Sequence, residues 1–287
     1  MGSTGRSAIA VGIDWKDNHF LSKSGVKLNI NLVSYGLTED ENQVIDEVIS
    51  SLSYVFEFER NFDYKLTTQW MSDNWKISFY WIFTYLMLIF SGQQWMRNRE
   101  PFQLRSTLFL WNLFLALFSI TGTLRVLPEM VYVVREHGFA QSVCDNGFIT
   151  RVNVSSVWSW LFVMSKVPEL GDTLYAYGDV ASTGRWYLGV NYMIHAIMYS
   201  YYAMRAINIK IPKPIAMFIT SSQLIQMVFG VFATLYALHK KSNRFDCLLS
   251  YTTIYSAIFM YFSYFVLFFN FFYHSYIKRS KNKQKSN

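Results

Sequence analysis

Charged residues are scarce in this chain, and their scarcity excludes a protein that is surrounded by water on every side. Only 16% of its 287 residues are charged, against roughly 25% in ordinary soluble domains. Hydrophobic residues make up 52% of the chain, and aromatic residues make up 19%. Such a composition is typical of a bundle of membrane helices.

Cysteine is almost absent, and so are the common motifs of catalysis. Cys144 and Cys247 allow at most one disulfide and form no CxxC metal signature, so we interpret each as an ordinary small apolar residue. The chain has no glycine-rich phosphate loop, HExxH or GxSxG motif, and we expect no secretory signal at its start. No motif therefore predicts a metal ion or a cofactor.

Long apolar runs fill the chain after Lys76. A membrane span needs roughly 20 residues; the run at 154–173 is the doubtful one, because its purely apolar part stops at Met164. We predict an all-α, polytopic membrane helical bundle with six apparent spans, at 77–93, 107–124, 154–173, 187–207, 214–238 and 249–275. The predicted domains are an N-terminal extension (1–55), the bundle (56–277) and a basic cytosolic tail (278–287).

The N-terminal extension has one helical signal. Thr38 and Glu41 form a capping box, and apolar residues then recur at helical spacing from Val44 to Val55. This pattern predicts an amphipathic helix that lies on the membrane or packs against the bundle.

Basic residues predict which ends of the spans face the cytosol. The first connection, around Arg97 and Arg99, and the tail from Lys278 to Lys285 are both strongly basic, so both are expected in the cytosol. Five apolar runs lie between them, and five crossings would put these regions on opposite faces. One crossing is therefore missing, or one run does not cross. A third basic loop, at 240–244, prevents the rule from deciding which.

Three apolar runs carry polar side chains at helical spacing. Run by run, these are Lys166, Glu169, Asp172 and Thr173; Asn191, His195, Tyr199 and Tyr202; and Thr220, Gln223 and Gln226. A single uncharged stripe often only joins helices, and that interpretation stays open for each. Three stripes with charged groups predict a polar chamber inside the bundle. Its histidine is either a hydrogen-bonded structural residue or a general base, proton relay or nucleophile.

At these residues the chain resembles the very-long-chain fatty acid elongase (ELO) family, and most closely the branch that extends saturated and monounsaturated chains. The likeness runs from about Phe56 to Lys278. It rests on KxxExxDT from Lys166, NxxxHxxMYxYY from Asn191 and TxxQxxQ from Thr220, in this order. The resemblance implies a seven-helix bundle in the endoplasmic reticulum membrane. It also implies condensation of a fatty acyl-CoA with malonyl-CoA to a 3-oxoacyl-CoA, with release of carbon dioxide and CoA.

The resemblance also implies roles for individual residues. Its catalytic residues would be Lys166, Asn191, His195 and Gln223, and its substrate-binding residues would be Glu169, Asp172, Tyr199, Tyr202, Arg205 and Gln226. The implied substrates are malonyl-CoA and fatty acyl-CoA, with no cofactor. Expected partners are the bilayer and either other elongation-cycle enzymes or a second copy, but no nucleic acid. Lys283 and Lys285 resemble a dilysine retrieval signal, and Asn153 begins a glycosylation sequon on the expected lumenal side.

One signature of that family has no counterpart here. In the family an HxxHH box follows KxxExxDT, whereas no two of this chain's five histidines lie within ten residues of each other. Leu174 is followed directly by Tyr175, so relative to the family this chain lacks a membrane helix and a short loop, about 25 residues. Restoring that span would also put the basic first connection and the basic C-terminal tail on the same face of the membrane.

The missing span sets our functional expectation. We expect an elongase-family chain with little or no condensing activity. The alternative is a non-catalytic splice form or paralogue that binds acyl-CoA or pairs with a full-length elongase. The ordered motifs argue against a transporter or receptor of similar composition.

Overall fold

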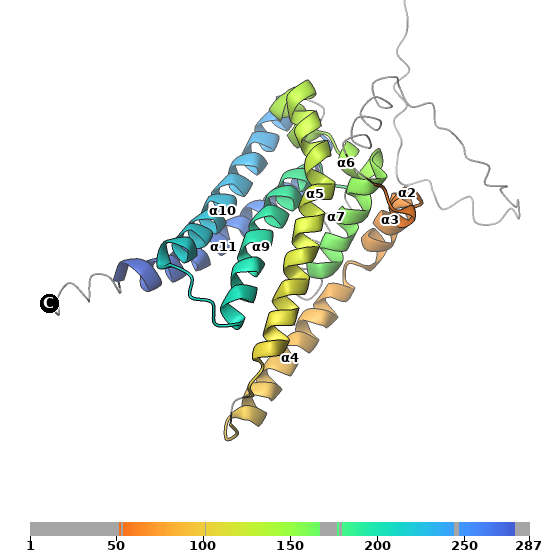
Figure 1. Cartoon of the computed structure of the whole chain (residues 1–287). Coiled ribbons are helices and arrows are strands. Elements are labelled where there is room, and N and C mark those ends of the chain that lie inside the picture. The colour runs from red at the N-terminus through yellow and green to blue at the C-terminus, as the bar shows by residue number, and fades with distance from the viewer. Residues whose placement is uncertain are drawn as a thin grey trace, which may run out of the picture. The chain divides into compact units, whose positions relative to one another are not determined.

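The computed structural model describes residues 52, 54–100, 102–166, 177, 180–243 and 247–278, all within one compact unit, Glu39–Asn287. Every regular element in these residues is a helix (Figure 1), which confirms the predicted all-α class. The predicted amphipathic helix before Val55 lies almost entirely outside the described residues. Glu169, Asp172, Lys283 and Lys285 lie outside them too.

The described helices differ in length and in their capacity to cross a membrane. They are α2 (Glu57–Arg60), α3 (Tyr64–Asn74), α4 (Ile77–Met96), α5 (Arg105–Cys144), α6 (Gly147–Thr150), α7 (Asn153–Lys166), α9 (Gly184–Ala206), α10 (Lys213–Ser242), α11 (Tyr251–Phe272) and the π-helix η2 (Tyr273–Lys278). Within the described chain three helical stretches are long and apolar enough to cross: Arg105–Cys144, Lys213–Ser242 and Tyr251–Ser275. The predicted count of six spans is therefore not confirmed, and α7 is described over 14 residues, up to the last one before a stretch that the structure does not describe.

Helix α5 is much longer than the run at 107–124 that the sequence suggested, because it continues through Pro128 to Cys144. It bends at Gly138, whose φ of 77° is a conformation that residues with a side chain rarely adopt. The bend brings the last turn of α5 to one end of the bundle, where the chain reverses through α6 into α7.

Helices α5, α7 and α9 pack together around one tyrosine. Gly122 of α5 lies against the ring of Tyr192 of α9, and any side chain at position 122 would collide with that ring. The Tyr192 hydroxyl donates to the carbonyl oxygen of Trp158 in α7 at 2.9 Å. Small residues at helix contacts let membrane helices approach closely, and Figure 1 shows these three helices side by side.

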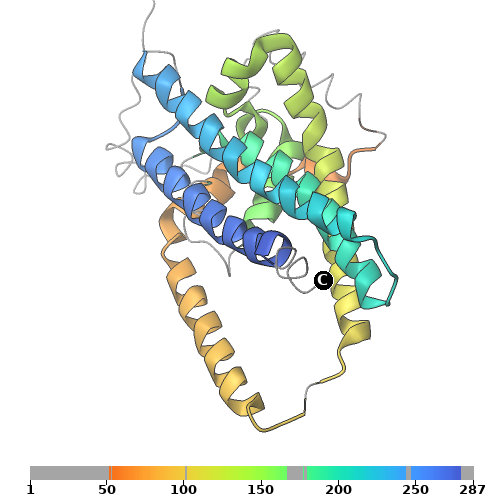
Figure 2. The same cartoon turned by 90° about the vertical axis from the view of Figure 1, so that its left-hand side faces the viewer.

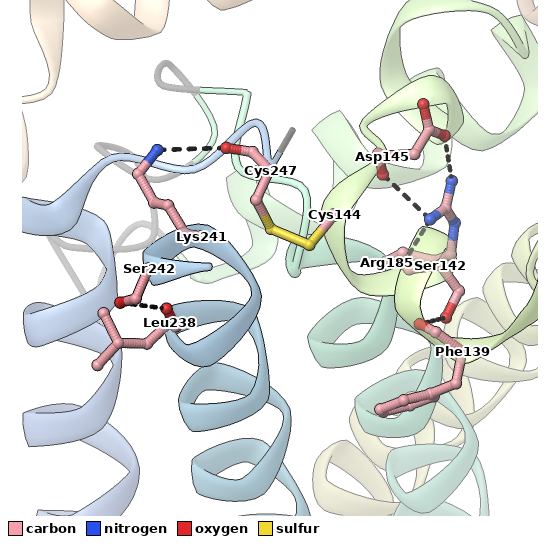
Figure 3. Close-up of a disulfide and its surroundings, with 9 residues drawn as sticks. All are labelled: Phe139, Ser142, Cys144, Asp145, Arg185, Leu238, Lys241, Ser242 and Cys247. Carbon is pink, nitrogen blue, oxygen red and sulfur yellow. Dashed lines mark hydrogen bonds and ion pairs between the residues drawn. A yellow bond between two sulfur atoms is a disulfide. The ribbon is translucent and has the colours of Figure 1, made fainter. Parts of the chain in front are cut away.

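A disulfide joins the end of α5 to the connection between α10 and α11 (Figure 3). Cys144 pairs with Cys247, and the Leu248 amide donates to the Cys144 carbonyl at 3.0 Å. Our interpretation of the cysteines as unpaired apolar residues was wrong. Their sequence separation is 103 residues, so only the packing of the helices brings them together. We call this end of the bundle the disulfide end.

The directions of the helices show where the chain lacks a crossing. Helices α5 and α10 run toward the disulfide end, and α9 and α11 run away from it, since Arg185 and Tyr251 lie near that end. Helix α7 also runs away from it, so α7 and α9, which follow one another, point the same way (Figure 1). Residues 167–183 between them are fewer than the roughly 20 that a helical crossing needs. The chain therefore returns toward the disulfide end within a connection that is shorter than a membrane helix.

Helix α4 stands apart from the other helices (Figure 2). It packs closely against none of the other described helices. Its aromatic and aliphatic side chains are mostly exposed, including Tyr80 at 75% and Leu88 at 68%. In a membrane protein such a surface faces lipid or another transmembrane helix.

Candidate active site

A cavity of about 460 Å³ lies inside the bundle, and we call it the chamber. Its walls come from α6, α7, α9, α10 and α11. Apolar and aromatic side chains supply most of its lining, with a few polar groups among them. This combination is typical of a site for a long apolar ligand that carries a polar head.

The chamber collects six of the ten residues that the sequence predicted for catalysis and substrate binding. They are Lys166, Asn191, His195, Tyr199, Gln223 and Gln226. Helical spacing puts Asn191, His195 and Tyr199 on one face of α9, and Gln223 and Gln226 on one face of α10; both faces line the chamber. Tyr202 and Arg205 lie near the end of α9, are exposed, and are not part of the lining. The chemical roles of all ten residues stay predictions.

His195 lies at the middle of α9 among groups with spare hydrogen-bonding capacity. Its ring centroid is 5.3 Å from that of Tyr199, in an edge-on arrangement. The Gln223 side-chain amide donates to the sulfur of Met198 at 3.0 Å, and a thioether is only a weak acceptor. The Oδ1 atom of Asn191 is buried and has no hydrogen-bond partner. The site thus has an imidazole, an amide donor and an unsatisfied amide acceptor.

Lys166 is the last described residue of α7, and it lines the chamber on the side away from the disulfide. Its ammonium group lies 5.7 Å from the ring centroid of Phe162, at cation–π distance. A cation in this place can attract an anionic group such as a phosphate or a carboxylate.

Helix α11 supplies one wall of the chamber, which the sequence patterns did not predict. Thr253, Ser256, Met260 and Tyr264 all line the chamber. Their spacing of three, four and four puts them on one helical face. The spacing of this stripe is visible in the sequence. It was not predicted because the stripe lies within the aromatic run 249–275, which has the composition of a uniformly apolar span.

Two hydrogen bonds between tyrosine and threonine hydroxyls join the segments around the part of the chamber that is nearest the disulfide end. The Tyr187 hydroxyl of α9 bonds with that of Thr234 in α10, and the Tyr177 hydroxyl lies 3.4 Å from that of Thr67 in α3. Burial raises the pKa of Tyr177 to about 12. Its phenol therefore stays protonated at physiological pH and serves as a structural contact.

A buried arginine holds the first turn of α9 in place. Arg185 is fully buried and donates to both carboxylate oxygens of Glu129 in α5, at 3.2 and 3.0 Å from its Nε. It also donates to a carboxylate oxygen of Asp145 at 3.1 Å and to the carbonyl oxygen of Ser142 (Figure 3). The network fixes α9 against the end of α5, and so positions the stripe that carries Asn191 and His195.

The sequon residue Asn153 is the first residue of α7. Its side-chain amide donates to the carbonyl oxygen of Arg60 at 2.9 Å, and the hydroxyl-bearing Ser155 of the sequon is fully buried. Its glycosylation stays a prediction, as does the dilysine signal, which lies outside the described residues.

Comparison with known proteins gives a family match and several similar relatives. The profile of the GNS1/SUR4 (ELO) family matches residues 70–177 and 174–284. "Very long chain fatty acid elongase 6" of Drosophila melanogaster is 39% identical over 265 residues, covering 83% of this chain and 84% of the relative. The protein of the same name from Homo sapiens is 39% identical over 256 residues, covering 80% and 96%. "Putative fatty acid elongase 3" of Caenorhabditis elegans is 36% identical over 259 residues, covering 81% and 80%.

The family match breaks between α7 and α9, and the alignments with the relatives contain positions that face no residue of this chain. The two stretches of the family match overlap only at residues 174–177. The human alignment has 256 positions but uses 80% of 287 residues, about 230, so about 26 positions face no residue of this chain. The same comparison for the Drosophila relative gives 265 positions against about 238 residues, and hence about 27 positions.

The family match covers most of the chain, and relatives at 39% identity align with four fifths of it. On this evidence the chain is a member of the GNS1/SUR4 (ELO) family.

Proposed function

We propose that this chain descends from very-long-chain fatty acid elongases and that its chamber binds a long-chain fatty acyl-CoA. In this proposal the chain condenses that substrate with malonyl-CoA only very slowly. One observation carries this proposal. His195 is the one histidine among the described residues that line the chamber, while about 26 positions of the human relative have no counterpart here. By the resemblance to the family, the HxxHH box belongs to that missing stretch.

The proposed reaction needs more than one imidazole. The thioester carbonyl must be attacked and CoA must leave; malonyl-CoA must then lose carbon dioxide and form the new carbon–carbon bond. Nucleophile, base and their supporting groups act as a unit, and removing one usually costs several orders of magnitude in rate. His195 alone can hold an acyl group or accept a proton, and in our proposal it lacks the second partner.

The binding half of the proposal depends on groups that are present. The apolar lining would accept the acyl chain. The Gln223 amide can turn from the Met198 sulfur, a weak acceptor, to a thioester oxygen, a stronger one. Lys166 would attract the anionic parts of CoA or the malonyl carboxylate. No cofactor is needed, because both reactants are activated as thioesters.

Elongation in microsomes tests the catalytic half. Membranes that contain this chain, supplied with labelled malonyl-CoA and a long saturated acyl-CoA, are expected to elongate at least about a thousandfold more slowly than membranes with equal amounts of the human relative. An elongation rate within about tenfold of that relative would refute the proposed impairment.

Photolabelling with a diazirine-bearing acyl-CoA tests the binding half. The chain should be labelled, and unlabelled acyl-CoA should compete. Ala257 lines the chamber whereas Phe259 of the same helix is 76% exposed, so Ala257→Trp should abolish competable labelling and Phe259→Trp should preserve it. Formation of the Cys144–Cys247 disulfide, seen on a non-reducing gel, checks that both variants fold. Equal labelling of the two variants would contradict binding in the chamber.

We propose the endoplasmic reticulum membrane as the location, with the disulfide end in the lumen and the tail in the cytosol. Disulfides persist in oxidising compartments, and the basic first connection and tail belong to the opposite end. The basic residues near the disulfide have local structural contacts: Lys241 donates to the Cys247 carbonyl at 3.3 Å, and Lys240 lies over the ring of Tyr236. They therefore do not oppose this orientation.

A cysteine in the tail tests this orientation. Both native cysteines are paired, so Ser280→Cys gives the chain its only free thiol. In cells whose plasma membrane alone is permeabilised, a membrane-impermeant maleimide should label Ser280→Cys fully. Leu248→Cys, next to the disulfide, should be labelled only after the internal membranes are opened. Protection of the tail would show that the orientation is inverted.

A further inference from the structure

A short segment before α11, residues 247–250, is bonded to two other parts of the bundle, and we call it the strap. The Leu248 amide donates to the carbonyl oxygen of Cys144, the last residue of α5, at 3.0 Å. The Leu248 carbonyl oxygen accepts from the amide of Ser182, just before α9, at 3.1 Å. The disulfide between Cys144 and Cys247 makes the first of these connections covalent (Figure 3).

The strap also reaches two walls of the chamber. On the α9 side, Ala181 lines the chamber and belongs to one buried apolar cluster with Cys247 and Leu249. On the α11 side, Ser250 is the N-cap of the helix. Its hydroxyl oxygen accepts from the amide of Thr253, which lines the chamber, at 3.1 Å. The strap therefore joins these two walls at the disulfide end.

The disulfide is the one covalent link between the strap and α5. The strap's other connections among the described residues are single hydrogen bonds and apolar packing, and a single hydrogen bond contributes only modestly to stability. A disulfide restricts the opening of the segments that it joins, and protein segments open locally when such restraints are weak. Loss of the disulfide is therefore expected to loosen the strap before it unfolds the bundle.

We propose that the strap is a redox-sensitive device that closes the disulfide end of the chamber. While Cys144 and Cys247 are joined, the strap holds Ala181 and Thr253 in place around the end of a long acyl chain. Reduction by a dithiol transfers two electrons and two protons to the disulfide, which gives two thiols and turns the dithiol into its own disulfide. The freed strap then opens, and the chamber retains a long chain poorly. The proposal rests on the proposed function in one respect, namely that the chamber binds a fatty acyl-CoA.

Amide hydrogen exchange tests the strap without any ligand. The detergent-solubilised chain, oxidised or reduced with dithiothreitol, is compared with the double variant Cys144→Ser with Cys247→Ser. The amides of Ser182, Leu248 and Thr253 donate the bonds described above, so peptides that contain them should exchange at least about tenfold faster without the disulfide. Peptides from the middle of α7 should keep their rates, and dithiothreitol should not affect the double variant. Unchanged exchange around the strap would overturn the proposal.

Competition for acyl-CoA photolabelling tests the effect of the strap on the ligand. Along α9, Gly184, which lines the chamber near its disulfide end, lies about 16 Å from His195. An octanoyl chain, with bonds of roughly 1.5 Å, is at most about 11 Å long and does not span this distance. Loss of the disulfide should therefore weaken competition by a long saturated acyl-CoA at least about tenfold and leave competition by octanoyl-CoA unchanged.

Reoxidation of the reduced chain should restore both the slow exchange and the competition by the long-chain acyl-CoA. Equal weakening for the two acyl-CoAs would show that the whole bundle had loosened, and unchanged competition would show that the strap does not hold the chain. Either result would overturn the proposal. If the oxidised chain itself took up no competable label, the proposed binding would fail, and the role of the strap in retaining a ligand would fail with it. Hydrogen exchange would then still decide whether the disulfide holds the two walls.

Discussion

An in-frame insertion between Leu174 and Tyr175 of the roughly 26 residues that this chain lacks relative to human elongase 6 is expected to raise elongation by at least about a thousandfold. The insertion supplies the crossing between α7 and α9 and, by the family resemblance, the HxxHH box. Incorporation of labelled malonyl-CoA into a long-chain acyl-CoA, measured in microsomes and normalised to the amount of protein, reports the gain.

Two controls separate the chemistry of the insertion from its effect on folding. The same insertion with its histidines replaced by phenylalanine restores the crossing and should stay inactive. The complete insertion combined with His195→Ala should also lose most of the gained activity, because His195 lines the same chamber. If the insertion without histidines were as active as the complete one, the missing span would matter only for folding, and the proposed loss of catalytic groups would be wrong.

The sequence predicted much of the candidate site because polar residues are costly in membrane helices and therefore informative. Asn191, His195 and Tyr199 recur at four-residue intervals, and Gln223 and Gln226 recur at three. Such spacings need no tertiary information, and all five residues line one chamber. The outward positions of Tyr202 and Arg205 could not be foreseen, because they depend on where α9 passes the edge of the chamber.

Features that depend on distant partners were beyond the sequence. The disulfide joins residues 103 apart, and the ion pair between Glu129 and Arg185 joins two different helices. Neither pairing has a local signal, since both arise from the antiparallel packing of α5 on α9 and from the course of α10. The length of α5 was underestimated for a related reason. Pro128 usually marks the end of a helix, yet packing carries this helix through it to Cys144.

The charge pattern of the sequence and the directions of the helices both bear on the number of membrane crossings. Charge alone indicated an odd number of apolar runs between two regions that should share a face. Helix α5 begins, and helix α11 ends, at the end of the bundle opposite the disulfide. Six described helices lie along this path, namely α5, α6, α7, α9, α10 and α11, and the return between α7 and α9 is made by residues 167–183, which are fewer than a membrane helix needs.

Replacement of Arg185 by glutamine is expected to destabilise the bundle by about 3–5 kcal/mol, the usual cost of removing one partner from a buried ion pair. Arg185 is fully buried, and Glu129 is 1% exposed, so the substitution leaves a carboxylate without its cation. Denaturation of the detergent-solubilised chain, followed by the loss of its fluorescence or by aggregation on heating, measures the change. Arg135 is the matched control, because its pair with Glu136 is exposed at 79% and 48%. Exposed pairs contribute little, so Arg135→Gln should barely shift the transition.

The double variant Arg185→Gln with Glu129→Gln tests whether charge is the cause of that loss. Neutralising Glu129 removes the uncompensated buried charge and leaves two amides that can bond to each other, so the double variant should recover a substantial part of the lost stability. Asp145 has a second cationic partner in Arg151, so it does not become an isolated charge. If the double variant were as unstable as Arg185→Gln alone, Arg185 would act through its packing and its hydrogen bond to Ser142. The position of α9, and with it that of Asn191 and His195, would then depend on side-chain shape more than on the buried charge pair.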